Sequence, residues 1–391
     1  MADAYIVAGT RTAGGRKGGR LREWHPADLG AAVLDEIVRK TKVPGEKVDD
    51  VIFGCVSQIG AQTGNLARNS VLGSSLPISV PGTTVDRQCG SSQQALHFAA
   101  QAIMSGTQDV VIAGGVESMT RVPMGAAIMD ALKEGHGQPW DGKKIVEKYP
   151  NVQFNQFMGA EMVAKEWDIT REQLDEFALT SHLNASKATK EGRFNDELLV
   201  LEGLDKEGNK VAHDSDEGIR HNSTLEGLQS LNTLAPKGRI TAGTSSQICD
   251  GASAVMLVSE KALKELNLTP LARIHSLALA GTDPVMMLAG PIPATQTALE
   301  RVGLTLDDID LYELNEAFGS VPLAWAKELG ADLSKLNVNG GAQALGHPLG
   351  ATGTKLMTTL VYELKRRGGK YGLLAICEGG GTANATIIEA C

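Results

Sequence analysis

The sequence predicts an α/β protein built from two similar halves. Strand-like runs alternate with amphipathic helices, which favours βαβ units and a mainly parallel sheet covered by helices. The same order of elements occurs twice, at a nearly constant separation. Val48 and Ile309 are 261 positions apart, and Cys89 and His347 are 258 apart. A repeat of this length indicates a duplicated domain and not a solenoid.

The first copy begins with a strand at residues 4–12, a helix at 25–41 and a strand at 48–56. A helix at 91–106 and a continuous apolar run at 109–115 complete it. A short apolar run of this kind is typical of a buried strand.

The second copy repeats the plan with a strand near 272–284, a helix at 291–303 and a strand within 309–319. A helix at 351–369 and a strand at 371–377 follow. In both copies a reactive side chain stands just before the fourth element. Because ligands of α/β sheets bind beyond the carboxyl ends of strands, we expect a site where the halves meet.

The segment between the two copies differs from both, because it is richer in polar residues and turn clusters. We interpret it as an insertion that covers the site. It contains a helical stretch at 162–192, with Asp168 and Thr170 as candidate caps. Residues 250–260 are expected to return as a strand of the first half. The predicted division is residues 1–119 with 246–268, then 120–245, then 269–391.

Composition excludes several classes of protein. The 391 residues are 42% hydrophobic and 21% charged, which is typical of a globular protein. A net charge of −9 argues against general nucleic-acid binding. The five cysteines form neither a disulfide framework nor a metal-binding pattern. No secretory signal and no apolar run of membrane-spanning length is visible, so we expect a cytoplasmic protein without membrane contact.

Three separate segments hold a reactive side chain among small residues. They are Cys89 in VDRQCGSSQQA, His347 in NVNGGAQALGHPLGATG and Cys377 in AICEGGGTANA. A thiolate is a nucleophile, a histidine can generate it, and glycine lets backbone N–H groups approach a developing oxyanion. Cys89 also precedes a predicted helix, whose dipole is expected to lower the thiol pKa. A fourth segment, NEAFG, presents Asn315 at a strand end. These residues indicate acyl chemistry on a thiol.

With these segments considered together, the chain resembles a thiolase over essentially its full length. The resemblance rests on CGSS, GGVESM, NEAF, GHP and the final C-x-G. It implies a five-layered αβαβα fold of two similar halves with an inserted loop domain, assembled as a homodimer or homotetramer. It also implies an acetyl-CoA C-acyltransferase that cleaves a 3-ketoacyl-CoA with coenzyme A, in the manner of fatty-acid β-oxidation.

The resemblance assigns a role to each reactive residue. Cys89 would take the acyl group, and His347 would activate it and contribute to an oxyanion hole. Asn315 would hold a water in that hole. Cys377 would exchange a proton with the acetyl unit, and the Gly379 N–H would help form a second oxyanion hole.

Four further residues match family positions that contact coenzyme A or the substrate: Arg220, Ser246, Met158 and Phe318. Coenzyme A would be a cosubstrate, and neither a bound cofactor nor a metal is expected. Phe157 replaces a histidine that is common in short-chain biosynthetic members, which favours a longer or branched acyl chain. The consequence of Gln343 is open. The role of the basic loop that holds Arg11, Arg16, Lys17 and Arg20 is also open. The loop is either a solvated surface turn, or it contacts a phosphate group or another subunit.

Other functions remain as alternatives. One is a short-chain biosynthetic acetoacetyl-CoA thiolase, and a more distant one is a thiolase-like acyl-CoA-binding protein without catalysis. A decarboxylating ketoacyl synthase has a related fold but typically lacks a second cysteine, so Cys377 argues against it. A dinucleotide-binding dehydrogenase would need G-x-G-x-x-G after the first strand, and GTRTAGG does not supply it.

Overall fold

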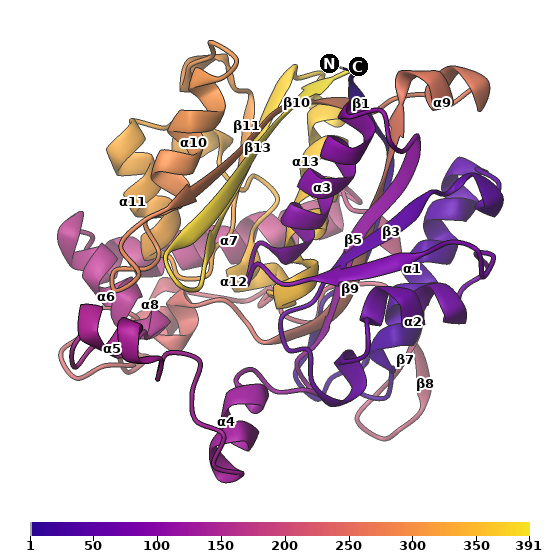
Figure 1. The fold of residues 1–391 in the computed structure, drawn as a ribbon. Helices are drawn as coiled ribbons and strands as arrows, with labels where there is room; N and C mark the ends of the chain where they lie inside the picture. The colour runs from indigo at the N-terminus through magenta and orange to yellow at the C-terminus, as the bar shows by residue number, and fades with distance from the viewer. Residues whose placement is uncertain (1) are drawn as a thin grey trace.

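The computed structural model describes residues 2–391. Its two halves are two mixed sheets joined edge to edge, because strands β1 (Ala4–Thr12) and β10 (Ala272–Gly281) pair antiparallel with Tyr5 opposite Arg273. Figure 1 shows the sheets on the two sides of the helices α3 and α13. The inserted segment lies across one end of both halves. Among the described residues, no helix has the length and apolarity needed to cross a membrane.

In the N-terminal half the strand order is β1-β9-β5-β3-β4. The further strands are β9 (Cys249–Ser259), β5 (Val110–Ser118), β3 (Asp50–Gly54) and β4 (Gly82–Val85). β3 pairs parallel with β4 and β5, whereas β9 pairs antiparallel with β1 and β5. The expected mainly parallel sheet is therefore wrong. The return of β9 as a strand of this half is confirmed, and it enters in the opposite direction after the insertion.

The C-terminal half repeats this arrangement with the order β10-β13-β12-β11. Strands β12 (Tyr371–Glu378) and β13 (Thr382–Ala390) form an antiparallel hairpin, and β11 (Leu311–Leu314) pairs parallel with β12. Gly380 and Gly381 in the hairpin turn have φ of 82° and 78°, a conformation that glycine adopts without strain. This turn brings the second cysteine segment to the site.

The helices form three of the five layers, which confirms the predicted αβαβα fold. One outer layer is α1 (Pro26–Thr41) and α2 (Leu66–Gly73), and the other is α10 (Pro291–Glu300) and α11 (Ser320–Leu329). The middle layer is α3 (Ser91–Met104) and α13 (Thr352–Arg367). One apolar cluster joins α3 and α13 to the inner faces of both sheets. The repeat thus places Cys89 and His347 before two neighbouring helices.

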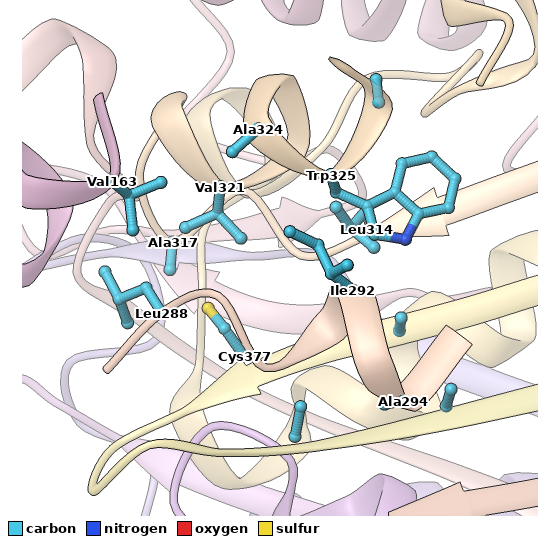
Figure 2. Close-up of a cluster of buried hydrophobic side chains, with 14 of the residues drawn as sticks. Val163, Leu288, Ile292, Ala294, Leu314, Ala317, Val321, Ala324, Trp325 and Cys377 are labelled. Atoms are coloured by element: carbon cyan, nitrogen blue, oxygen red, sulfur yellow. The ribbon is translucent and has the colours of Figure 1, made fainter. Parts of the chain in front are cut away.

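The outer face of the C-terminal sheet carries its own core, drawn in Figure 2. Trp325 of α11 is fully buried, and its ring N–H donates to the Thr295 hydroxyl at 2.9 Å. Cys377 of β12 belongs to this cluster and lies near Leu288 and Ala317. Burial in this core leaves the Cys377 thiol little contact with water.

The inserted segment contains α4 (Ala126–Lys133), α5 (Lys143–Lys148), α6 (Gln156–Glu166), α7 (Arg171–Lys190), the hairpin β7–β8 (Leu201–Leu204 and Lys210–His213) and α8 (Leu225–Gln229). The helix predicted over 162–192 is interrupted, because Asp168 has φ of 45° and ends the first helix. Asp168 is therefore not a cap. Thr170 is the cap of α7, and it forms a capping box with Gln173. The predicted domain boundaries themselves stay a prediction.

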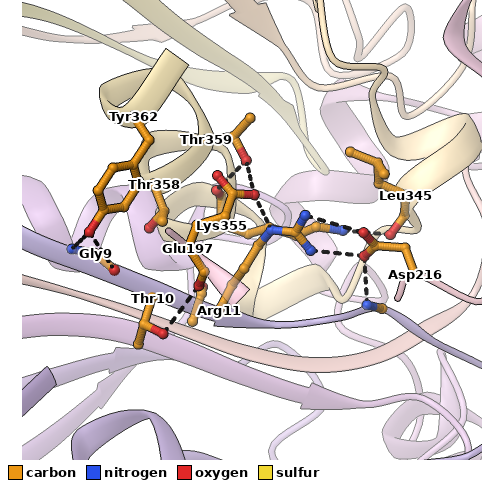
Figure 3. A network of polar contacts seen from close by, with 12 residues as sticks. Gly9, Thr10, Arg11, Glu197, Asp216, Leu345, Lys355, Thr358, Thr359 and Tyr362 are labelled. Atoms are coloured by element: carbon orange, nitrogen blue, oxygen red, sulfur yellow. Dashed lines mark hydrogen bonds and ion pairs between the residues drawn. The ribbon is translucent and has the colours of Figure 1, made fainter. Parts of the chain in front are cut away.

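A buried ionic network ties the inserted segment to both halves (Figure 3). Arg11 of β1 is 0% exposed, and its guanidinium contacts Glu197 at 2.6 Å and Asp216 at 2.9 Å. Thr359 of α13 donates to the same Glu197 at 3.0 Å. Burial alone would raise the pKa of Asp216, but Arg11 and then Lys355 outweigh it and hold that pKa below its ordinary value. Arg11 is thus a structural residue, and of the basic loop only Arg16, Lys17 and Arg20 lie nearer the surface.

We predict that Arg11→Met destabilises the protein by about 3–5 kcal/mol, because it leaves two carboxylates buried without their cation. Urea unfolding followed by circular dichroism measures the change. The matched control is Lys210→Met, which breaks a pair with Glu202 in which both side chains are exposed, and should leave the midpoint unchanged. Equal effects of the two substitutions would contradict a special role for the buried network.

Candidate active site

Cys89 occupies the turn between β4 and α3, as predicted. Gln88, the preceding residue, has φ of 48°, a conformation that non-glycine residues rarely adopt, and its N–H donates to Asp86 at 2.7 Å. This turn leaves the Cys89 thiol half-buried. Cys89 and Gly379 both line a cavity of about 710 Å³. The structure thus brings the first and third reactive segments to one space.

The protonation of Cys89 differs from the sequence expectation. Burial, and after it the Glu378 carboxylate, raise the pKa of Cys89 to about 12. The dipole at the start of α3 therefore does not keep Cys89 as a thiolate at rest. Desolvation and the nearby negative charge raise the thiol pKa by more than the dipole can lower it. The prediction of a lowered pKa is wrong for this state. Cys89 accordingly needs a base before it can act as a nucleophile.

His347 is held as a neutral imidazole. Its Nδ1 lies 2.5 Å from the Thr352 hydroxyl, which itself donates to the Pro348 carbonyl at 3.2 Å. The Thr352 oxygen therefore accepts the Nδ1 proton, and Nε2 is left as the basic nitrogen. Asn315 Nδ2 donates to that Nε2 at 3.3 Å. Burial, together with the positive charge of Lys355, lowers the pKa of His347 to about 3.

Two buried side chains hold the loop that carries His347. Lys355 of α13 donates to the carbonyls of Leu345 and Gly346 at 2.6 and 2.9 Å. Gln343 Nε2 donates to the Thr244 carbonyl at 3.1 Å, and the Gln343 carbonyl accepts from Gln247 Nε2 at 2.6 Å. Gln343 therefore has a structural role, because it ties the histidine loop to the turn at residues 241–247.

Asn315 ends strand β11 beside a buried carboxylate. Glu316 accepts from the Ser181 hydroxyl at 2.7 Å and from Asn337 Nδ2 at 2.9 Å. The N–H of Gln343 donates to it at 3.0 Å. Glu316 therefore joins the NEAF segment to α7 and to the histidine loop. Asn315 is set beside His347 by this framework, as the sequence predicted.

Cys377 stands at the end of β12 with its thiol protonated. Burial and then the neighbouring Cys89 raise the pKa of Cys377 well above its ordinary value. The two sulfur atoms are thus close enough to influence each other. A buried thiol in this state is suited to donate a proton and not to act as a resting nucleophile.

A second cavity of about 230 Å³ adjoins the first. Both cavities are lined by Met124, Gln156 and Leu349, so they share a wall. His347, Ser246, Phe318 and Phe157 line the second one. The Phe157 and Phe318 rings meet edge to face at 5.5 Å. His347 and Cys89 therefore belong to two adjoining spaces under one covering segment.

Two of the four predicted contact residues lie elsewhere. Arg220 is exposed and lines neither cavity, and Met158 is 52% exposed and likewise lines neither. Ser246 and Phe318 do line the second cavity. All four remain predictions as contacts of coenzyme A. The sequence analysis assigned no role to three further residues of this region, Thr352, Lys355 and Glu378. The only signal for them in the sequence is that they lie near the GHP and C-x-G segments.

Comparison with known proteins agrees with this geometry. The family model described as "Thiolase, N-terminal domain" matches residues 4–261, and "Thiolase, C-terminal domain" matches residues 268–390. The chain belongs to the thiolase family. The resemblance seen in the sequence is thereby confirmed, and the matched models cover nearly the whole chain.

Several thiolases are similar along their full length. The chain is 50% identical to "Steroid 3-ketoacyl-CoA thiolase FadA6" of Mycobacterium tuberculosis, covering 100% of this chain and 94% of that protein. It is 43% identical to a 3-ketoacyl-CoA thiolase of Vibrio vulnificus, with full coverage of both. The crystal structure of human mitochondrial 3-ketoacyl-CoA thiolase superposes with a TM-score of 0.89 at 38% identity, covering 100% and 99% of the two chains.

Proposed function

We propose that this thiolase cleaves a 3-ketoacyl-CoA with coenzyme A, giving acetyl-CoA and a shortened acyl-CoA. The observation that carries this proposal is a thiol and a neutral imidazole that line adjoining cavities, with a second, buried and protonated thiol close enough to the first to affect its charge. Each group is in the protonation state that its step requires. The same site run backwards performs a Claisen condensation.

In the first half-reaction the Cys89 sulfur bonds to the 3-keto carbon while His347 Nε2 accepts the thiol proton. The resulting oxyanion is stabilised by the N–H groups of Cys89 and Gly379. The C2–C3 bond then breaks, and Cys377 gives its proton to the departing acetyl-CoA enolate. Cys89 is left as an acyl thioester. The raised pKa of Cys377 supports this role, because the thiol holds its proton until a strong base forms.

In the second half-reaction coenzyme A removes the acyl group. His347 first returns its proton to the Cys377 thiolate. The coenzyme A sulfur then bonds to the acyl carbon while His347 accepts its thiol proton, and that proton passes to the Cys89 sulfur as the Cys89–acyl bond breaks. Asn315 is next to His347 Nε2, where a water that it holds would donate to the thioester oxygen. Ping-pong kinetics follow from the covalent intermediate. Coenzyme A acts as a cosubstrate, and we propose that no resident cofactor or metal takes part.

We predict that acetyl-CoA transfers its acetyl group to Cys89 of the wild-type protein and to none of the residues of Cys89→Ala. Mass spectrometry of acid-quenched protein measures the added mass. Cys377→Ala should still accept the acetyl group but lose at least about 100-fold in thiolysis, because only cleavage needs its proton. The exposed Cys391→Ala serves as the control with unchanged activity. Full turnover by Cys89→Ser would overturn the covalent mechanism.

We further propose that the acyl group is long or bulky and that the working direction is degradative. The cavity of about 710 Å³ beside Cys89 is mainly lined by apolar and aromatic residues, including Trp140, Tyr149 and Phe154. A cavity of this size exceeds the needs of a four-carbon substrate. Both the steroid thiolase relative and the 3-ketoacyl-CoA thiolases support the same direction.

The proposed preference for a long or bulky acyl group is tested by measuring the rate of thiolysis of a series of 3-ketoacyl-CoA substrates. The series runs from four carbons to long and sterol-derived chains. We expect kcat/KM to rise with acyl size, because each buried methylene adds about 0.8 kcal/mol of binding. Trp140→Ala should reduce the difference between large and small substrates, since it enlarges and exposes the cavity. A strong preference for the four-carbon substrate would instead favour a short-chain biosynthetic thiolase.

We propose that the protein works in the cytoplasm as a homodimer or as a tetramer of dimers. All five cysteines are free, which fits a reducing compartment. Among residues 2–391, strand β4 pairs with β3 alone and leaves an open sheet edge. Three apolar side chains are exposed on segments next to this edge in the fold: Leu72 of α2, Phe98 of α3, and Ile78, which shortly precedes β4. An open edge flanked by apolar groups is suited to pair with a second copy.

Sedimentation velocity tests this assembly. We expect at least twice the chain mass of 41.2 kDa, and we expect Phe98→Asp to shift the protein toward the monomer. Leu333→Asp is the matched control, because Leu333 is 50% exposed against 40% for Phe98 and belongs to the C-terminal half and not to the half that contains β4. A wild-type monomer at micromolar concentration would contradict the proposal.

A further inference from the structure

Glu378 is a buried carboxyl that the mechanism above does not use. It follows Cys377 on β12 and is 0% exposed. Successive strand residues point to opposite faces, so Cys377 enters the outer core while Glu378 faces the start of α3. There it lies against Gly90, the residue after the nucleophile: a Cβ placed on Gly90 would come within 2.0 Å of Glu378 Oε1. The carboxyl is thus packed between the two thiol segments.

Only one of its oxygens has a protein partner. Glu378 Oε2 accepts from the Thr382 hydroxyl at 2.6 Å, whereas Oε1 is buried without a hydrogen bond among the described residues. Asn384, which lies beside it, donates its amide N–H to the Gly90 carbonyl at 3.1 Å and not to Glu378. A buried oxygen left unpartnered favours the neutral acid over the carboxylate.

The charged groups around Glu378 act in opposite directions. Burial raises its pKa to about 7, although the Thr382 hydroxyl and the Arg87 guanidinium lower it, and Asp86 raises it. The thiols of Cys89 and Cys377 lie in the same space, and the Glu117 and Asp86 carboxylates also raise the pKa of Cys89, less than Glu378 does. The Glu378 carboxylate is also the largest electrostatic cause of the raised pKa of Cys89.

We propose that Glu378 acts on the reaction through Cys89. The charge of its carboxyl group controls how readily the Cys89 thiol becomes a thiolate. In its neutral form Glu378 leaves the Cys89 thiol free to ionise. In its ionised form Glu378 places a negative charge beside the same sulfur. That charge opposes the formation of the negatively charged thiolate. This inference rests on the proposed role of Cys89 as nucleophile, and it assigns no contact between Glu378 and the substrate.

The proposal has a specific consequence for pH. As pH rises through 7, Glu378 loses its proton and the pKa of Cys89 increases. The fraction of Cys89 present as thiolate therefore rises less steeply with pH than it would for a thiol without this neighbour. Glu378→Gln keeps the shape of the side chain but cannot ionise. The two proteins should therefore be alike at low pH and differ above pH 7.

Alkylation of Cys89 by iodoacetamide, read peptide by peptide with mass spectrometry, measures this directly. We expect the ratio of the Glu378→Gln rate to the wild-type rate to be near one at pH 5.5. It should rise to about threefold at pH 8.5, since lowering a thiol pKa by one unit gives tenfold more thiolate of weaker nucleophilicity. Thr382→Val removes a hydrogen bond to the carboxylate, so its profile should inflect at higher pH than the wild type.

Glu300→Gln, an exposed glutamate of α10, is the matched control and should follow the wild type at every pH. Urea unfolding of each variant checks that the fold is kept. A Glu378→Gln ratio that does not change between pH 5.5 and 8.5 would overturn the proposal. Failure of acetyl transfer to Cys89 would overturn the proposed function instead, so the two outcomes are distinguishable.

Discussion

The buried contact of Arg11 with Glu197 and Asp216 is the constraint on which the rest of this structure depends. Arg11 comes from the first strand of the N-terminal half, and both carboxylates come from the inserted segment. Thr359 of the C-terminal helix α13 joins the same network. Removing Arg11 would leave two carboxylates buried without their cation, which costs far more than an exposed pair is worth. One cluster therefore holds all three parts of the chain in register.

The histidine loop depends on the same region. Lys355 stands one helical turn before Thr359 on α13, and it satisfies two carbonyls just before His347. Its charge also lowers the pKa of both His347 and Asp216. The helix that completes the buried network thus orients the loop of His347, the proposed base, and keeps its imidazole neutral. Stability and catalysis share these residues.

Burial sets the chemistry of the site. It raises the pKa of both thiols and lowers that of the imidazole, so each group is uncharged at rest. Proton transfer between neutral partners then avoids storing charge in an apolar space. In the proposed mechanism charge develops only once substrate is bound, and the N–H groups of Cys89 and Gly379 are proposed to stabilise it. Glu378 is the exception, because its pKa is close to neutral pH.

The sequence by itself determined the duplicated plan and the segments that carry Cys89, Asn315, His347 and Cys377, and its resemblance to thiolases supplied the αβαβα fold. Periodicity and glycine-rich turns are local properties, so they can be read without knowing what packs against them. Tertiary structure alone decided the antiparallel return of β9 and the burial of Arg11 at the end of β1, whose role the sequence left open. It also decided the raised pKa of Cys89. Strand direction, ion pairing and desolvation all depend on residues far away in the chain, and no local pattern records them.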